Sequence, residues 1–231
     1  MPDGAGSTTR RIQVNHLILM LFFLASTGWA APSIQSSQFT AFNGNSVNAA
    51  VPAGAANEVL IAFVALPCTK SGGLSGLVSG WVVISNSSGT CGVVSLKRVS
   101  DGTETSVTVN LTNSGAGNAL VLRVADADIN SLVVGSAAVV SGSPNAPATP
   151  DVPGSNQNVL WLTYANAMRG PVLAPSGYSN VLSASNGAYP QNDEFMVSEK
   201  SNTVSWPYGE DAGAWTLSAS SISRAQTIGI R

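Results

Sequence analysis

Histidine is almost absent from this chain of 231 residues, and its single occurrence, His16, lies in a segment that we expect to be removed. Residues 1–30 have the features of a secretory signal peptide. Without them the exported chain has no imidazole, which is the most common acid–base group and transition-metal ligand near neutral pH. The sequence therefore predicts a protein that is not an enzyme and that uses no cofactor or metal.

Three features identify the signal peptide. Arg10 and Arg11 form a basic start, an apolar run covers residues 17–25, and small residues surround a cut after Ala30. The run is shorter than the ~20 residues needed to cross a bilayer, and no later segment is long and apolar enough. We expect export to the periplasm, the cell surface or the medium, with no membrane span in the exported chain. A retained anchor is the alternative.

Charge is also scarce. Charged residues make up 10% of the chain and the formal net charge is −2, whereas ordinary soluble domains are about 25% charged. No basic patch is available to neutralise phosphates, so nucleic-acid binding is not expected. Hydrophobic residues account for 44% of the chain, which argues against extensive disorder.

Only two cysteines are present, Cys68 and Cys91. An even number in an exported chain predicts one disulfide. Two unbonded thiols are the alternative, and a metal site is disfavoured because the exported chain has no histidine and no third cysteine.

The hydrophobic pattern is typical of β-structure. Residues 103–113 alternate with a period of two, as a half-buried strand does. Residues 59–66 and 132–140 are nearly continuous apolar runs, as expected for central strands, and residues 158–167 carry large side chains on both faces. Turn residues recur about every 8–12 positions. We predict an all-β, two-sheet antiparallel β-sandwich of jelly-roll type that follows an N-terminal signal helix.

A proline-rich stretch, residues 142–157, divides the exported chain near its middle. Its prolines disfavour both helix and sheet pairing and favour an extended connection. They are Pro144, Pro147, Pro150 and Pro153. We expect residues 31–231 to form a single sandwich in which two halves, about 31–141 and 158–231, are joined by this connection. Two tandem sandwiches are the alternative.

The two halves keep similar features in the same order. Each has an apolar strand, a Ser-Gly-Trp or Ser-Gly-Tyr turn, a short strand, a Thr/Ser-rich stretch and a closing strand. We align the closing strands at residues 119–124 and 214–219. Tyr178 follows Trp81 by 97 positions. Because the order of features is kept as well as their type, we predict an ancient duplication.

Three motifs carry a resemblance to known proteins: Ser79-Gly80-Trp81, Pro175-Ser176-Gly177-Tyr178 and the strand around Trp215. Over about residues 57–222 the chain resembles a duplicated β-sandwich found in phage virion and tail-associated proteins and in exported bacterial surface proteins. The resemblance implies packing or attachment roles without shared catalytic residues. The signal peptide departs from the virion pattern, because phage structural proteins assemble in the cytoplasm.

Three pairs of carboxylates could support hydrolysis by paired acids: Asp126 with Asp128, Asp193 with Glu194, and Glu210 with Asp211. Solvated turn residues are the more ordinary interpretation of all three pairs. A Ser–Lys dyad could use one of three lysines, Lys70, Lys97 or Lys200. The chain has no nucleophile elbow to support such a dyad.

Aromatic side chains supply the candidate binding residues. Those in apolar strand patterns are assigned to the core: Trp81, Trp161 and Trp215. Those near prolines in expected loops are the candidates for binding a glycan: Tyr189, Trp206 and Tyr208. The alternative for the loop residues is that they fold back to cap the end of the sandwich.

We therefore expect a non-catalytic exported surface or structural protein that acts in self-assembly or attachment, as a homo-oligomer or surface assembly. The low charge fits neutral contact surfaces, because interface cores are depleted in charge. The final strand, residues 226–230, could pair within the fold or add to a neighbour's sheet edge. The alternatives are a carbohydrate-binding module, a phage virion or tail component, and a hydrolase that uses paired acids.

Overall fold

A computed structural model describes most of residues 30–231. The described residues are 30–135, 138–141, 145–146, 157–168, 172–186, 193–204, 209–217 and 222–231. The predicted signal helix and most of the proline-rich stretch lie outside these residues. Within them the secondary structure is β-strand apart from one short 3-10 helix, and no helix there has the length and apolarity to cross a membrane.

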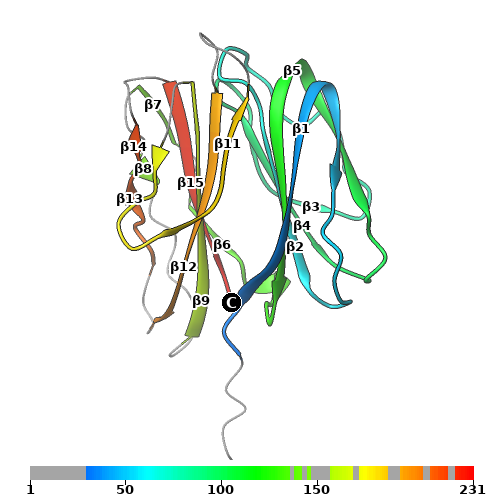
Figure 1. Ribbon diagram of the computed structural model, residues 1–231, viewed down its shortest axis with the longest axis vertical. Helices are drawn as coiled ribbons and strands as arrows, with labels where there is room; N and C mark the ends of the chain where they lie inside the picture. Colours follow the sequence, from blue (N-terminus) through cyan, green and yellow to red (C-terminus); the bar gives the residue numbers. More distant parts are fainter. Residues whose placement is uncertain are drawn as a thin grey trace, which may run out of the picture.

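Two antiparallel sheets lie side by side in Figure 1 and form the fold. The first sheet has the order β1-β5-β2-β4-β3 and consists of β1 (Ser33–Ala50), β5 (Ser106–Ala125), β2 (Val59–Ala65), β4 (Val93–Val99) and β3 (Val82–Ser87). The second has the order β11-β12-β9-β15-β6 and consists of β11 (Ser179–Asn186), β12 (Asp193–Val204), β9 (Gln157–Ala167), β15 (Ile222–Ile230) and β6 (Val133–Val134), with β7 (Ala138–Ser141) also paired to β15. The predicted all-β, two-sheet antiparallel sandwich is confirmed.

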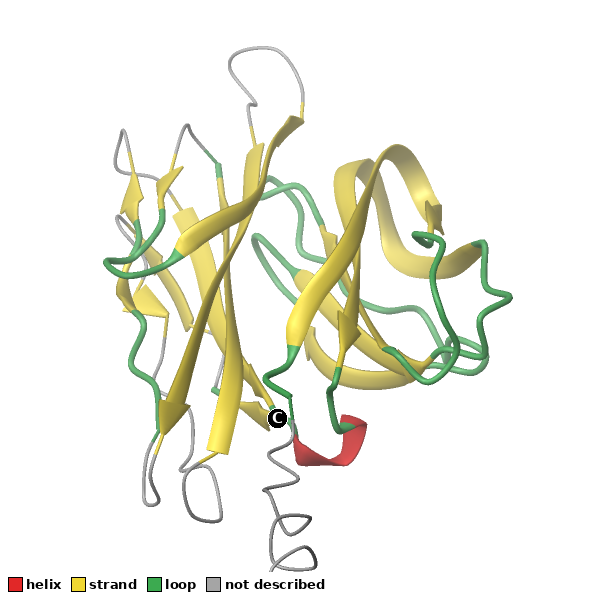
Figure 2. Cartoon of the chain, turned by 60° about the horizontal axis from the view of Figure 1, so that its bottom comes forward, coloured by secondary structure: helices red, strands yellow, loops and turns green. Residues whose placement is uncertain are grey.

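Small elements complete the structure outside the two sheets. Two short pairs are formed by β10 (Val172–Leu173) with β14 (Thr216–Leu217) and by β13 (Gly213–Ala214) with β8 (Asn145–Ala146). The 3-10 helix η1 (Ile129–Ser131), red in Figure 2, connects the first sheet to the second.

The two sheets pack face to face around a shared apolar core. From the first sheet, Ile61 and Phe63 of β2 enter this core, and from the second sheet Leu162 and Tyr164 of β9 meet them. The rings of Phe63 and Tyr164 pack edge to face with centroids 5.6 Å apart. The central strands of both halves therefore stabilise one common interior.

The other face of the first sheet is buried as well, because the long strands β1 and β5 curl over it. Val47 near the end of β1 and Val107 and Val109 near the start of β5 lie in this covering layer. They pack in one apolar cluster with Leu60 and Ala62 of β2. Both faces of β2 are thus covered, which explains its continuous apolar run. The alternation predicted for residues 103–113 is also confirmed, since buried and exposed side chains alternate from the start of β5.

Two expectations about strand position have different outcomes. Residues 132–140 were expected to form a central strand, but β6 and β7 lie at the edge of the second sheet. The apolar side chains of β6 have another cause: Val134 packs against the shared core, and Val133 packs beside Trp161. Of the two possibilities for residues 226–230, the structure selects pairing within the fold, because β15 is buried between β9 and the β6–β7 edge.

The two sheets have the same strand order. The strands β1, β5, β2, β4 and β3 correspond to β6 with β7, β15, β9, β12 and β11. The turns before β3 and β11 are equivalent too, because the Trp81 N–H donates to the Val78 carbonyl (3.0 Å) and the Tyr178 N–H to the Pro175 carbonyl (3.1 Å). The glycine before each aromatic has a φ of 75° or 83°, which residues with a Cβ rarely adopt.

The register of the sheets agrees as well. One row of paired residues in the first sheet is Val82, Lys97, Ile61 and Leu122, and the matching row in the second is Ser179, Glu199, Leu162 and Ile228. Each row begins directly after the aromatic residue of its turn. A bulge follows Val83 in β3 and Asn180 in β11, one residue further along in each strand. The two sheets therefore share strand order, turn geometry and register.

Two details of the predicted halves need correction. The strand equivalent to residues 119–124 is β15 (Ile222–Ile230), not residues 214–219, because Trp215 packs on the outer face of the second sheet. In addition, β6 and β7 precede the proline-rich stretch, so the second sheet contains strands from both sides of that stretch.

Candidate functional site

The sequence-predicted site residues divide into two groups. Tyr189, Trp206 and Tyr208, the candidate glycan-binding residues, lie outside the described residues, and their role stays a prediction. Cys68 and Cys91 form the predicted disulfide, and both are buried. The three tryptophans assigned to the core are also buried: Trp81, Trp161 and Trp215.

The carboxylate pair Asp126 and Asp128 has a structural role at Asp128. The Asp128 carboxylate accepts hydrogen bonds from the Ser131 hydroxyl and from the Asn130 N–H and caps η1. Both hydrogen bonds lower the pKa of Asp128, and the bond from the Ser131 hydroxyl has the larger effect. Within the described ranges, no group of three or more His, Cys, Asp or Glu side chains could hold a metal ion.

The pair Glu210 and Asp211 is separated by its partners. Glu210 is buried, and its Oε1 accepts hydrogen bonds from Lys200 Nζ (2.7 Å) and from the Tyr178 hydroxyl (3.0 Å). Asp211 instead accepts a hydrogen bond from the Gly213 N–H (3.0 Å). Glu210 therefore holds the turn before β11 against β12. No sequence pattern predicts that Lys200 and Glu210 meet, because no periodicity relates the two positions.

A second buried ion pair supports the first sheet. Arg123 of β5 is 1% exposed, and its Nη1 lies 2.9 Å from Glu58 Oε2 and 2.9 Å from Ser100 Oγ. Its Nε donates to the Pro52 carbonyl (2.9 Å). Arg123 thus holds the turn between β1 and β2 against β5. The alternation of side chains in β5 predicts an apolar residue at position 123, so the sequence pattern does not reveal this role.

A buried polar cluster joins the two sheets. The Gln226 side-chain carbonyl accepts hydrogen bonds from the Ser85 hydroxyl (2.8 Å) and the Tyr164 hydroxyl (3.1 Å). Its amide group donates to the Gly135 carbonyl (2.7 Å). Burial raises the pKa of Tyr164 to about 12. These groups satisfy one another inside the sandwich, as buried polar groups must.

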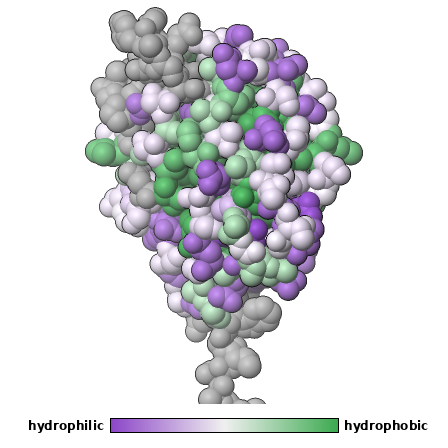
Figure 3. All heavy atoms as spheres, turned by 45° about the vertical axis from the view of Figure 1, so that its right-hand side comes forward, coloured by the Kyte–Doolittle hydropathy of each residue, from purple (hydrophilic) through white to green (hydrophobic). Residues whose placement is uncertain are grey.

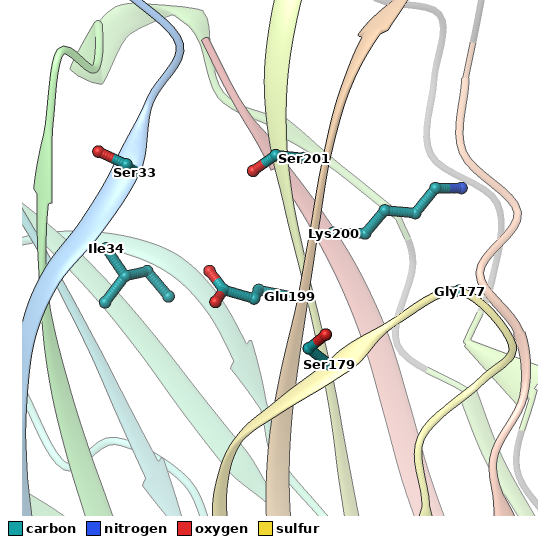
Figure 4. Close-up of a pocket in the computed structure, with 7 residues that line it drawn as sticks. All are labelled: Ser33, Ile34, Gly177, Ser179, Glu199, Lys200 and Ser201. Carbon is teal, nitrogen blue, oxygen red and sulfur yellow. The ribbon is translucent and has the colours of Figure 1, made fainter.

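An open notch of about 360 Å³ lies between the start of β1 and the edge of the second sheet (Figure 4). It forms because β11 begins opposite Glu199, whereas β12 continues beyond it to Val204. The lining residues are Ser33, Ile34, Gly177, Ser179, Glu199, Lys200 and Ser201. Figure 4 shows Glu199 pointing toward β1 and Lys200 pointing away. Burial raises the pKa of the Glu199 carboxyl, and among the described residues it forms no ion pair.

Strand β1 forms the edge of the first sheet beside this notch, and among the described strands none pairs with its outer side. Its 18 residues include no Lys, Arg, Asp, Glu or Pro, although charges and prolines are the usual protection of sheet edges. Phe39 is a large apolar side chain with 37% exposure on this strand. The part without an irregularity covers residues 36–44, because the register shifts between Ile34 and Ser36 and again between Gly44 and Ser46.

The other sheet edges are shorter or interrupted. The edge equivalent to β1 in the second sheet is split into β6 and β7, with two and four residues. The edge at β3 has six residues and a bulge, and the Leu74 N–H donates to the Asn86 side chain there (3.0 Å). The edge at β11 has eight residues and a bulge. Short and bulged edges resist pairing with another chain. Between its own two register shifts, β1 keeps residues 36–44 in register, a longer stretch than at any of these edges, so β1 is the most exposed to such pairing.

The face of the molecule that Figure 3 presents, with the right-hand side of Figure 1 brought forward, is mixed in polarity. Figure 3 shows apolar, neutral and hydrophilic residues interspersed there rather than separated into large blocks.

Comparisons of the chain with protein-family models, with curated proteins and with solved structures found no match. Function is therefore inferred from the geometry of this chain itself.

Proposed function

We propose that the protein is a non-catalytic exported surface or structural protein that acts by self-assembly or attachment. The observation that carries the proposal is the edge of β1, with 18 residues that include no charge and no proline. The backbone N–H and C=O groups of such an edge can pair with a further strand. The scarcity of charge in the chain supports a neutral contact, because interface cores are depleted in charge.

The contacts of three carboxylates support a structural role for each of them. Each is paired with a basic side chain: Glu58 with Arg123, Glu104 with Arg98, and Glu210 with Lys200. Each pair connects separate segments of the chain, which is a structural rather than a catalytic use of a carboxylate.

Export is part of the proposal. The disulfide between Cys68 and Cys91 is buried and supports folding in an oxidising compartment, where such bonds persist. The signal features of residues 1–30 support passage through a secretion pathway. Because phage structural proteins assemble in the cytoplasm, both features favour a surface or secreted role over a phage virion or tail component.

Sedimentation velocity tests the proposal on the chain expressed from the full sequence and purified after export. We expect association that increases with concentration between about 1 and 100 µM, as for a contact of weak to moderate affinity. The association should persist at about 1 M salt, because screening weakens contacts between charges and leaves a neutral strand edge intact. A single monomeric species across the whole range would contradict the proposed function.

A further inference from the structure

We propose that β1 pairs with β1 of a second copy of this chain, antiparallel and about a two-fold axis at Phe39. The two first sheets then become one continuous sheet. The inference rests on the proposed function and identifies its contact strand, its partner and its register.

The choice of β1 follows from comparing the strands that could form such a contact. The final strand β15 is buried between β9 and the β6–β7 edge, so it has no free side to offer. The halves share one strand order, and the edge of the second sheet that corresponds to β1 is short and divided. The chain therefore contains a protected version of this edge in one half and an unprotected version in the other.

The choice of a second copy follows from the composition of β1. In an antiparallel pair of identical strands, a charged residue near the axis lies close to its own copy, and like charges opposite each other are destabilising. No residue of β1 carries a charge, so pairing with itself encounters no such repulsion at any register. The exposed edge is thus self-complementary.

The position of the axis follows from the shape of the strand. Beyond Asn43 the strand curls, because the register shifts between Gly44 and Ser46 and the Ala50 N–H donates to the Thr40 hydroxyl (3.1 Å). An axis at Phe39 pairs residues 36–42 with their copies, and this stretch without a register shift is longer than an average strand of about 5–6 residues. It also places the two Phe39 rings opposite each other, and cross-strand aromatic pairs are favourable.

This register makes a specific prediction about the neighbours of Phe39. Ser37 and Ala41 lie two positions on either side of it on the same face, since they pair with Leu122 and Asn118 as Phe39 pairs with Leu120. Both side chains are exposed. With the axis at Phe39, Ser37 of one copy lies opposite Ala41 of the other copy.

Two double variants use this relation. Ser37→Lys/Ala41→Lys places lysine opposite lysine twice, and we expect the dissociation constant to increase about tenfold or more. Ser37→Lys/Ala41→Glu places lysine opposite glutamate twice, and we expect association at least as tight as that of the unmodified chain. The matched control for location is Ser183→Lys/Ser185→Lys on the exposed face of β11, which should leave association unchanged. Sedimentation velocity at about 50 mM salt, where screening is weak, measures all four proteins.

Each outcome decides the inference separately from the proposed function. If the unmodified chain associates and the Lys/Lys variant of β1 associates equally well, β1 is not the contact strand. If the Lys/Glu variant dissociates as the Lys/Lys variant does, the two-fold register at Phe39 is wrong. If the β11 control dissociates instead, the contact lies on the second sheet. A monomeric unmodified chain would refute the proposed function together with this inference. Thermal melting of every variant confirms that the exposed substitutions leave the fold intact.

Discussion

The hydrogen bond between Tyr164 and Gln226 leads to a prediction about the free energy of unfolding, and its magnitude follows from the contacts of the two side chains. In the first sheet, Phe63 and Leu120 occupy the equivalent positions, because they belong to the equivalent row of paired residues. One half therefore uses an apolar pair where the other uses a hydrogen-bonded pair. The prediction concerns Gln226→Leu, Tyr164→Phe and the double variant, which together convert the second pair into the first.

The magnitudes follow from the hydrogen bonds. Gln226→Leu removes the acceptor of the Tyr164 hydroxyl and the donor to the Gly135 carbonyl, and a buried polar group left without a partner costs about 1–3 kcal/mol. Ser85 keeps its contact with the Ser95 hydroxyl (2.8 Å). We therefore expect a loss of about 2–4 kcal/mol. Tyr164→Phe removes one neutral hydrogen bond, with a loss of about 1 kcal/mol.

The double variant should lose less than the sum of the single variants. Once Tyr164 is replaced by Phe, Gln226→Leu no longer leaves a hydroxyl group unsatisfied, so we expect a coupling free energy of about 1–2 kcal/mol. Urea denaturation of the oxidised protein at neutral pH measures it, as a change in midpoint at constant m-value. Ser183→Leu on the exposed face of β11, away from the proposed contact strand, is the control for the gain of a leucine side chain. The reasoning is refuted if the two single losses add within about 0.5 kcal/mol.

Two further predictions concern the same interior. Burial raises the pKa of Tyr164 from its ordinary value of 10.0 to about 12, so its contribution to stability is complete below pH 10 and is lost as the pH rises through 12. Tyr164→Phe should flatten this alkaline loss in denaturation curves between these pH values, and an unchanged slope would show that another group titrates. The disulfide closes a loop with a sequence separation of 23, and the loop-entropy relation predicts that Cys68→Ala/Cys91→Ala costs about 3 kcal/mol. A fall in Tm of about 6–12 °C is expected for a domain of this size, and a loss below about 1 kcal/mol would contradict the relation.

Patterns of neighbouring residues were sufficient to predict the elements of this fold. The alternation at residues 103–113, the apolar runs at 59–66 and 158–167, and the Ser-Gly-aromatic turns all correspond to observed structure. Each is a local feature, because side-chain periodicity and the need for a positive φ act within a few residues. The parity of the cysteines likewise predicted the disulfide, since two cysteines allow a single pairing.

The candidate site could be predicted only in part. The scarcity of charge favours a neutral contact surface without indicating where it lies. Residues 226–230, which could have paired within the fold or with a neighbour, are buried within the second sheet. The partners of Glu210 and Arg123 were also hidden, because each lies across strands whose pairing no local pattern records.

The division between sequence and tertiary structure has a physical reason. Alternation of side chains records which face of a strand is covered, and so the sequence by itself determined that this chain folds as layered β-sheets. It holds no record of which strand lies beside which, because the backbone groups that join strands are the same in almost every residue. Only the tertiary structure decided that the strands up to Ala125 form one sheet and those from Val133 onward the other, that β15 is enclosed, and that the uncharged strand β1 is left at the edge.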